Sequence, residues 1–198
     1  MSKWQSGIFL NIGNNNVIVT AHPDDEVLWA SSFPLKYPER NWTVICCSVP
    51  RMDSIRAWKF FNACDVLGVS PRLIPSQETS PDQDLAHLDV LDLSGYDMIV
   101  THNAHGEYGH RHHRNVHEYV TSNYDNVVTF GYSKGKLGSI HHKLTPFEYQ
   151  IKLKALKQYN HLFPYRGDNI PKWEALIHRY ADVEGLDFSL ETFDEFTR

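Results

Sequence analysis

The sequence lacks a block of basic residues and lacks any long hydrophobic run. Its net charge is −5, whereas proteins that bind nucleic acid or anionic membranes usually carry clustered lysine and arginine. No run approaches the roughly 18 apolar residues of a membrane-spanning helix. The opening MSKWQSGIFL also lacks the long apolar core of a signal peptide. We therefore expect a cytoplasmic protein with no nucleic-acid partner and no membrane span.

Cysteine is scarce as well, which argues against a disulfide-based scaffold. The chain has three cysteines: Cys46 and Cys47 are adjacent in a strand-like run, and Cys64 lies in a helical pattern. Buried apolar side chains are the simplest interpretation of all three. There is no internal repeat and no low-complexity tract, so a repeat architecture is excluded. A length of 198 residues suits one globular domain over 1–198.

Strand-like and helical patterns alternate along the chain. The expected strands cover 16–21, 42–48, 72–76, 97–103 and 126–130. The expected helices cover 25–35, 54–68, 110–119, 145–159 and 171–180, the last within a helical tail at 161–198. Thr145 and Glu148 have the spacing of a capping box, with Pro146 at the first helical position. This order predicts a Rossmann-like α/β fold, with a mostly parallel, doubly wound sheet flanked by helices.

Two unusual segments follow expected strands. AHPDDE (21–26) comes directly after the first strand, and HNAHGEYGH (102–110) follows the strand at 97–103. The chain has twelve histidines, and six of them fall between His102 and His117. In an open α/β sheet, ligands bind outside the carboxyl ends of the strands, where both segments are expected. Three adjacent carboxylates repel one another, and a divalent cation would offset that repulsion.

The spacing of the polar residues favours a catalytic metal site. His22 and Asp25 are three residues apart, so both can face one point while Asp24 lies beside them. In GHRHH, His110 and His113 have the same spacing. Two histidines and one carboxylate leave coordination positions open, which is typical of catalytic and not of structural zinc sites. Taken alone, the acidic triplet would indicate a solvated helix N-terminus, and the histidine pair would indicate surface residues. Together the two segments favour a metal-binding site.

VIVTAHPDDEVLWASS and THNAHGEYGHRHHRNV resemble the two signature segments of the PIG-L, or LmbE-like, N-acetylglucosamine deacetylases. The resemblance is strongest over 16–160. It implies a Rossmann-like fold and a zinc-dependent hydrolase. Such an enzyme would remove an acyl group, normally acetyl, from the amine of a glucosamine-containing substrate. The expected partner is therefore a small molecule or glycoconjugate that bears an N-acyl amino sugar.

The resemblance also implies which residues do the chemistry. His22, Asp25 and His113 would hold the Zn²⁺, and another divalent ion such as Fe²⁺ is compatible with the same ligands. Asp24 would be the general base that takes a proton from the attacking water. Zinc lowers the pKa of bound water to about 7 in favourable sites, which makes amide hydrolysis feasible at neutral pH.

Three further residues receive roles from the resemblance. Tyr108 and His110 would stabilise the oxyanion or assist departure of the amine. Arg56 occupies a position that often contacts substrate. One departure from the family is the pair Arg111-His112, where Pro-Asp is usual, so that His112 competes with His113 as a ligand. Because adjacent helical side chains point about 100° apart, we expect His113 to bind the metal and His112 to face away.

Two other functions fit part of this pattern. A non-haem iron oxygenase also uses two histidines and one carboxylate, but we expect such oxygenases on all-β scaffolds. A sugar-binding module that has lost its chemistry would not need Asp24 beside the metal. Elsewhere, His141 and His142 follow a glycine-rich stretch, GYSKGKLGSI, and are expected in a solvated loop.

Overall fold

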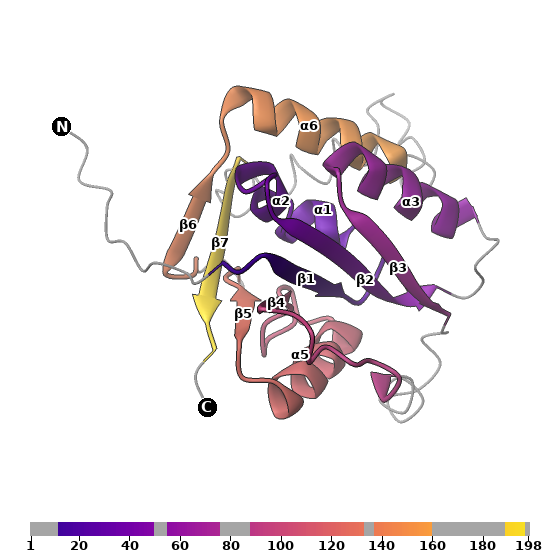
Figure 1. Cartoon of the computed structure of the whole chain (residues 1–198), viewed down its shortest axis with the longest axis vertical. Coiled ribbons are helices and arrows are strands. Elements are labelled where there is room, and N and C mark those ends of the chain that lie inside the picture. Colours follow the sequence, from indigo (N-terminus) through magenta and orange to yellow (C-terminus); the bar gives the residue numbers. More distant parts are fainter. Residues whose placement is uncertain (1–11, 50–54, 76–87, 133–136, 160–188, 197–198) are drawn as a thin grey trace.

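The computed structural model describes residues 12–49, 55–75, 88–132, 137–159 and 189–196. Within these residues the centre of the molecule is a sheet with the strand order β3-β2-β1-β4-β5-β7-β6 (Figure 1). Its strands are β1 (Asn15–Thr20), β2 (Asn41–Val49), β3 (Ser70–Pro75), β4 (Met98–Thr101), β5 (Val127–Phe130), β6 (Ile140–Lys143) and β7 (Leu190–Glu195).

The first five strands are parallel, as the alternating pattern predicts. β1 pairs with β2 on one side and with β4 on the other, and β3 and β5 extend the sheet outward. Val17, Ile18 and Val19 of β1 are almost completely buried, as expected for a strand with helices on both faces. The prediction of a Rossmann-like, mostly parallel sheet is confirmed.

Helices cover both faces of the sheet. One face carries α1 (Asp25–Trp29), α2 (Ser32–Lys36), α3 (Ile55–Leu67), α6 (Pro146–Leu156) and the short helix η1 (Lys157–Tyr159), and the other carries α5 (Arg111–Asn123) (Figure 1). Each face has its own hydrophobic cluster. Phe33 and Phe60 are buried in the first, and Val116 and Val120 of α5 are buried in the second.

Two predicted helices show how local signals act. The helix expected over 25–35 is divided: α1 ends at Trp29 and α2 begins at Ser32. The capping box at the start of α6 is confirmed, because the Glu148 N–H donates to Thr145 Oγ1 over 3.3 Å and the Thr145 N–H donates to Glu148 Oε2 over 2.6 Å. Each of these bonds satisfies an N–H group that the helix leaves unpaired.

Strands β6 and β7 correct the sequence-based expectations. His141 and His142 lie in β6 and not in a solvated loop, and residues 190–195 of the expected helical tail form β7. β7 runs antiparallel between β5 and β6 and buries Phe193. Both strands are short and polar, so their stability comes from pairing with residues far away in the sequence. The remainder of the predicted tail, with the helix at 171–180, lies outside the described residues.

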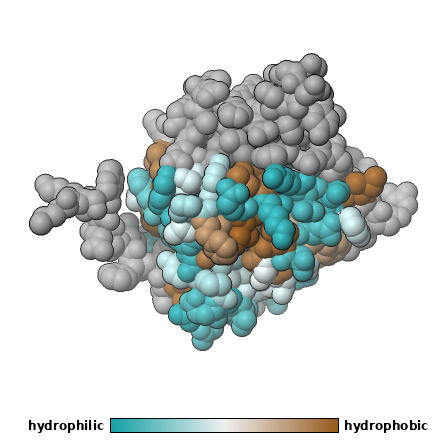
Figure 2. Space-filling view, turned by 90° about the horizontal axis from the view of Figure 1, so that it is seen from above, coloured by the Kyte–Doolittle hydropathy of each residue, from teal (hydrophilic) through white to brown (hydrophobic). Residues whose placement is uncertain are grey.

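The described surface is mainly polar on the side that lies at the top of Figure 1. There, hydrophilic residues border a smaller hydrophobic patch (Figure 2). Within the described ranges no helix has both the length and the hydropathy needed to cross a membrane. The cytoplasmic location stays a prediction. The three cysteines are free and buried, as expected.

Candidate active site

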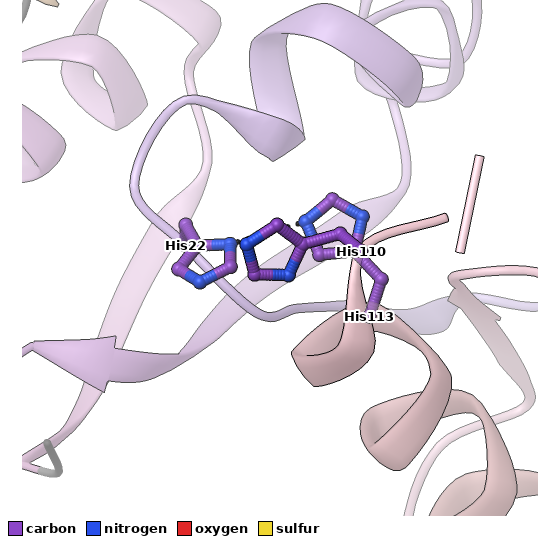
Figure 3. A group of neighbouring side chains, drawn as sticks. All are labelled: His22, His110 and His113. Carbon is purple, nitrogen blue, oxygen red and sulfur yellow. Dashed lines mark hydrogen bonds between the residues drawn. The ribbon is translucent and has the colours of Figure 1, made fainter. Parts of the chain in front are cut away.

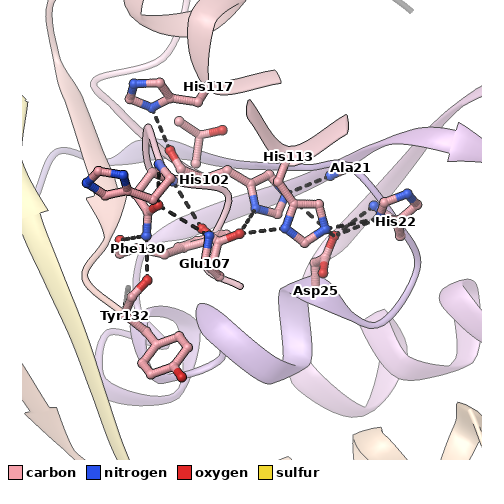
Figure 4. Close-up of polar contacts among 12 residues, drawn as sticks. Ala21, His22, Asp25, His102, Glu107, His113, His117, Phe130 and Tyr132 are labelled. Atoms are coloured by element: carbon pink, nitrogen blue, oxygen red, sulfur yellow. Dashed lines mark hydrogen bonds and ion pairs between the residues drawn. The ribbon is translucent and has the colours of Figure 1, made fainter. Parts of the chain in front are cut away.

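The three predicted metal ligands meet at the carboxyl ends of β1 and β4, which are neighbours in the sheet. His22 Nδ1 lies 3.1 Å from His113 Nε2. The Oδ2 atom of Asp25 lies 3.5 Å from His22 Nδ1 and 3.4 Å from His113 Nε2 (Figure 4). The exposed fraction of each residue is below a tenth. Three donor atoms so close together, and so well shielded from water, form a candidate site for one cation.

His110 and Tyr108 complete the outer side of this cluster. Nitrogen atoms of His22, His110 and His113 lie within 4.8 Å of one another, and the three imidazoles converge in Figure 3. The Tyr108 ring stands edge-on to His113, with 5.4 Å between ring centroids, and lies 5.9 Å from His110. Tyr108 is half-exposed. It therefore lies between the buried donors and solvent, where a substrate would arrive.

The turn that carries the first segment is built from its own acidic side chains. The carbonyl of Asp24 accepts from the N–H groups of Val27 and Leu28 and so begins α1. The Asp25 carboxylate reaches back to the N–H of His22 over 2.8 Å, and Glu26 reaches back to the N–H of Asp24 over 3.0 Å. Both carboxylates thus satisfy backbone donors, and that of Asp25 also faces the site.

Charge in the site separates the two aspartates. Burial raises the pKa of Asp24, the neighbouring Asp25 carboxylate raises it further, and Arg56 acts against both. For Asp25, burial also raises the pKa, but His113 and His102 outweigh it and hold the pKa well below its usual range. Asp25 is therefore held as a carboxylate suited to a cation. Asp24 has an increased proton affinity, which suits a base.

Glu107 and His102 lie behind the predicted ligands, and the sequence alone predicts no role for either of them. Oε2 of Glu107 accepts from Nδ1 of His113 and lies 2.9 Å from Nδ1 of His102 (Figure 4). Burial raises the pKa of Glu107, but the two imidazoles outweigh it and hold it at about 2. With Nδ1–H directed to Glu107, His113 presents the Nε2 lone pair to Asp25 and His22. Burial lowers the pKa of His113, and the carboxylates of Asp25 and Glu107 act against it. A bound metal would take the place of the proton at Nε2.

His102 lies behind the predicted ligands with Glu107 and is not one of them. Asp25, His102 and His113 also offer donor atoms within 4.8 Å of one another. However, the N–H of Ala21 donates to Nε2 of His102 over 2.9 Å. In a neutral ring this bond uses the lone pair that a metal would need and leaves Nδ1–H to donate to Glu107. Burial lowers the pKa of His102, but Glu107 and Asp25 outweigh it and raise the pKa to about 9, and the protonated ring that this favours has no lone pair to offer. His22, Asp25 and His113 stay the predicted ligands, and His110 lies within reach of His22 and His113 as well.

Asn103 folds the second segment around Glu107. Its Nδ2 donates to the carbonyls of Phe130 and Tyr132 over 2.8 and 2.6 Å, which ties the end of β4 to the end of β5. Its Oδ1 accepts from the N–H groups of His105 and Glu107. Asn103 and Glu107 are both buried. The signal available in the sequence was their place as polar residues in HNAHGEYGH, a segment with two glycines that follows a strand.

His112 lies beside the site but is not one of the donors brought together in the described residues. It is buried, and its ring stands edge-on to His22 with 5.2 Å between centroids. It therefore packs against a predicted ligand and does not point to solvent. Arg56, half-buried on α3, lies near enough to Asp24 for its charge to act on that carboxyl. Whether His112 stays off a bound metal is still a prediction.

Comparison with known proteins identifies the family and the fold. The family model described as PIG-L, GlcNAc-PI de-N-acetylase, matches residues 17–124, which is more than half of the chain and includes both segments. An uncharacterised protein of Acanthamoeba polyphaga mimivirus is 25% identical over 146 residues, which cover 62% of this chain and 64% of that protein. The chain thus spans less than two thirds of the length of this relative.

Two solved structures show the same fold. An N,N'-diacetylchitobiose deacetylase from Pyrococcus horikoshii has a TM-score of 0.65 and 16% identity, over 91% of this chain and 83% of that chain. A 4-carboxy-2-hydroxymuconate hydratase from Pseudomonas putida has a TM-score of 0.60 and 14% identity, over 93% and 97%. Identities this low establish the fold alone. The family model, with its match to both signature segments, shows that the chain belongs to the PIG-L family of de-N-acetylases.

Proposed function

We propose that this protein is a zinc-dependent N-deacetylase that hydrolyses the N-acyl group of an amino-sugar-containing small molecule or glycoconjugate. The observation that carries the proposal is the convergence of His22 Nδ1, Asp25 Oδ2 and His113 Nε2 within 3.5 Å of one another. This occurs beside Asp24, a carboxyl with raised proton affinity, in a chain of the PIG-L family.

The donors fit zinc. Two imidazole nitrogens and one carboxylate oxygen are a common protein ligand set for catalytic zinc, and they leave at least one position for water or substrate. The same donors also bind Fe²⁺. Zinc is proposed because it suits hydrolysis and because the family resemblance implies it, and elemental analysis distinguishes the two metals. When bound, the ion would act as a Lewis acid that activates water and polarises the acyl carbonyl.

The side chains of the protein would move the protons. Asp24 accepts the proton of the attacking water, because its carboxyl is near enough to Asp25 for that charge to act on it but is not among the clustered donors of the described residues. As the amide becomes tetrahedral, Tyr108 O–H and His110 N–H donate hydrogen bonds to the oxygen that gains charge. Asp24 or His110 then gives a proton to the nitrogen, and the carbon–nitrogen bond breaks to release the acid and a free amine.

The substrate class rests on the family and on Arg56. The Nε atom of Arg56 is buried and has no hydrogen-bond partner among the residues that the structure describes. A buried guanidinium nitrogen of this kind costs free energy unless a hydrogen-bond acceptor pairs with it. We infer that Arg56 contacts a polar group of the substrate near the scissile amide. The Pyrococcus horikoshii enzyme, whose substrate is N,N'-diacetylchitobiose, supports an N-acetylated amino sugar.

The proposal is tested by metal content and by acid release from a panel of N-acylated amino sugars. The Asp24→Asn variant should keep its metal and lose about 10²- to 10⁴-fold in turnover, because asparagine is nearly isosteric but cannot accept the proton. Asp65→Asn on the exposed side of α3 is the matched control. Purified protein without a divalent metal, or Asp24→Asn turnover equal to that of the parent, would reject the proposed mechanism.

The ligand register is tested separately. His113→Ala should lose the metal, whereas His112→Ala should keep it. If His113→Ala retains the metal and His112→Ala loses it, the ligand is His112, one residue earlier in the sequence. Iron in the native protein with no acid release would instead favour the oxygenase alternative, and sugar binding without turnover would favour a binding module.

A further inference from the structure

Asp24 has a backbone conformation that L-amino acids rarely adopt. Its φ is 121° and its ψ is −27°. Among the described residues other than glycine, only Asp24 and Glu107 have a positive φ. Such a conformation persists only when surrounding contacts hold it, and it is enriched at functional sites. The contacts that hold Asp24 therefore bear on the chemistry of its side chain.

Glu26 makes the contact that fixes the N–H of Asp24. Its Oε2 accepts from this N–H over 3.0 Å, and its Oε1 accepts from the hydroxyl of Tyr159. Glu26 and Tyr159 are both completely buried. Since a buried carboxyl group is costly unless its oxygens are paired, a residue used only for packing would be apolar. Here each oxygen has its own donor, and one donor is the backbone of the proposed base.

Tyr159 brings this support from a distant part of the chain. It lies in η1, directly after α6, and belongs to the hydrophobic cluster that packs on the face of the sheet covered by α3. Its hydroxyl is thus held by the packing of a part of the chain that is distant from the metal-binding segments in the sequence. Glu26 connects that rigid position to the turn between β1 and α1.

We propose that Glu26, oriented by Tyr159, is a positioning residue that holds Asp24 in its strained conformation and so aims the general base. This inference rests on the proposed function for its catalytic consequence. The metal ligands are held by other bonds: Asp25 accepts from the His22 N–H, and His113 donates to Glu107. Loss of the Glu26 contact should therefore displace the base and leave the metal in place.

Three variants separate positioning from packing. Glu26→Leu removes both acceptors and should lower kcat by at least about 10-fold, since a small misplacement of a reacting group can cost up to about 10²-fold. KM and metal content should stay near the parent values. Glu26→Gln should largely restore kcat, because its amide oxygen can accept from the Asp24 N–H while its NH₂ donates to Tyr159. Tyr159→Phe should reduce kcat several-fold without loss of metal.

A structural measurement is made on the same variants. In crystal structures of the metal-loaded proteins, φ of Asp24 should stay positive in the parent and in Glu26→Gln and leave that region in Glu26→Leu. If Glu26→Leu does not fold, Tyr159→Phe takes its place, with a displaced Glu26 carboxyl as the expected change. An unchanged Asp24 with unchanged kcat would overturn the inference, as would a displaced Asp24 with unchanged kcat.

The two proposals fail in different ways. If the parent protein releases no acid from any substrate, the proposed function is wrong, and the Asp24 backbone in the Glu26 variants still decides whether Glu26 holds that residue. If the parent is active and Asp24→Asn is not, but Glu26→Leu retains full kcat, the function stands and the positioning role is wrong.

Discussion

The carboxylate of Glu107 accepts a hydrogen bond from Nδ1 of His113, six residues further along the chain. A carboxylate behind a ligating histidine fixes the tautomer and orientation of the ring and increases its basicity, and removing it typically costs about 10- to 100-fold in metal affinity. We predict a loss of this size for Glu107→Gln. The amide oxygen can still face both imidazoles, but the NH₂ group would then meet the Asn103 N–H, which donates to Oε1 of Glu107 over 3.0 Å.

Competition with a chelator measures this affinity. Glu118→Gln, an exposed substitution on the same helix as His113, is the control and should bind metal like the parent. Equal affinity for the parent and Glu107→Gln would show that Glu107 does not support the ligand.

The conformation of Asp24 predicts that a glycine variant at this position is more stable than an alanine variant, which is the reverse of the usual order in helices. Because φ is 121°, a Cβ atom is strained there, and Asp24→Gly should unfold with a free energy about 1 kcal/mol larger than that of Asp24→Ala. Denaturant unfolding of both variants gives the difference. At Asp65, an exposed position in the interior of α3, the order should be the ordinary one, with alanine more stable by about 1 kcal/mol. The same order at both positions would mean that Asp24 is not strained.

Lys152 and Glu191 form a buried ion pair that joins α6 to β7. Nζ of Lys152 lies 2.5 Å from Glu191 Oε1 and donates to the carbonyl of Leu28 over 3.1 Å. Removing one partner leaves an uncompensated buried charge, so Lys152→Met should lower the free energy of unfolding by about 3–5 kcal/mol. The exposed Lys154→Met on the same helix should change it by no more than about 0.5 kcal/mol. Similar unfolding curves for the two variants would contradict the prediction.

The parts of the fold with strong local signals were predictable. β1 is centred on three adjacent β-branched apolar residues, Val17 to Val19, and α6 has a capping box with a proline at its first position, so each is specified by residues next to one another. β7 is different, because LETFDE has no strong apolar alternation. Its place depends on Phe193 packing against Phe33 and on pairing with β5 and β6. Such partners cannot be identified without the fold.

The site divides in the same way. His22, Asp25 and His113 belong to segments whose composition and family resemblance point to a metal, and the structure brings their donor atoms together. Glu107 and Tyr159 act through contacts with other side chains. Nothing in the local sequence says that Tyr159, 133 residues from Glu26, donates a hydrogen bond to it. Supporting residues of this kind depend on tertiary structure.

Because His142 is buried, we predict that the protein loses stability as the pH falls below about 6.5. Burial lowers the pKa of His142 to about 4, with Glu191 acting against this shift and Lys36 adding to it. In the unfolded chain a histidine takes up its proton near pH 6.5. Between about pH 6.5 and 4 the unfolded state therefore binds more protons than the folded state, and stability falls as the pH falls. Above about pH 6.5 the effect is absent, and over the whole window it amounts to at most about 3 kcal/mol.

A substitution that keeps the hydrogen bond but does not titrate isolates this effect. Nδ1 of His142 lies 3.1 Å from Ser32 Oγ, and the amide of His142→Gln can make the same bond. The free energy of unfolding of the parent should therefore fall relative to that of His142→Gln as the pH drops from about 6.5 to 4, and the difference should be constant above that range. His141→Gln removes the exposed neighbour in the same strand and should follow the parent. Parallel curves for the parent and His142→Gln throughout this range would mean that the folded protein accommodates a protonated His142, because the folded and unfolded states would then bind the proton equally well.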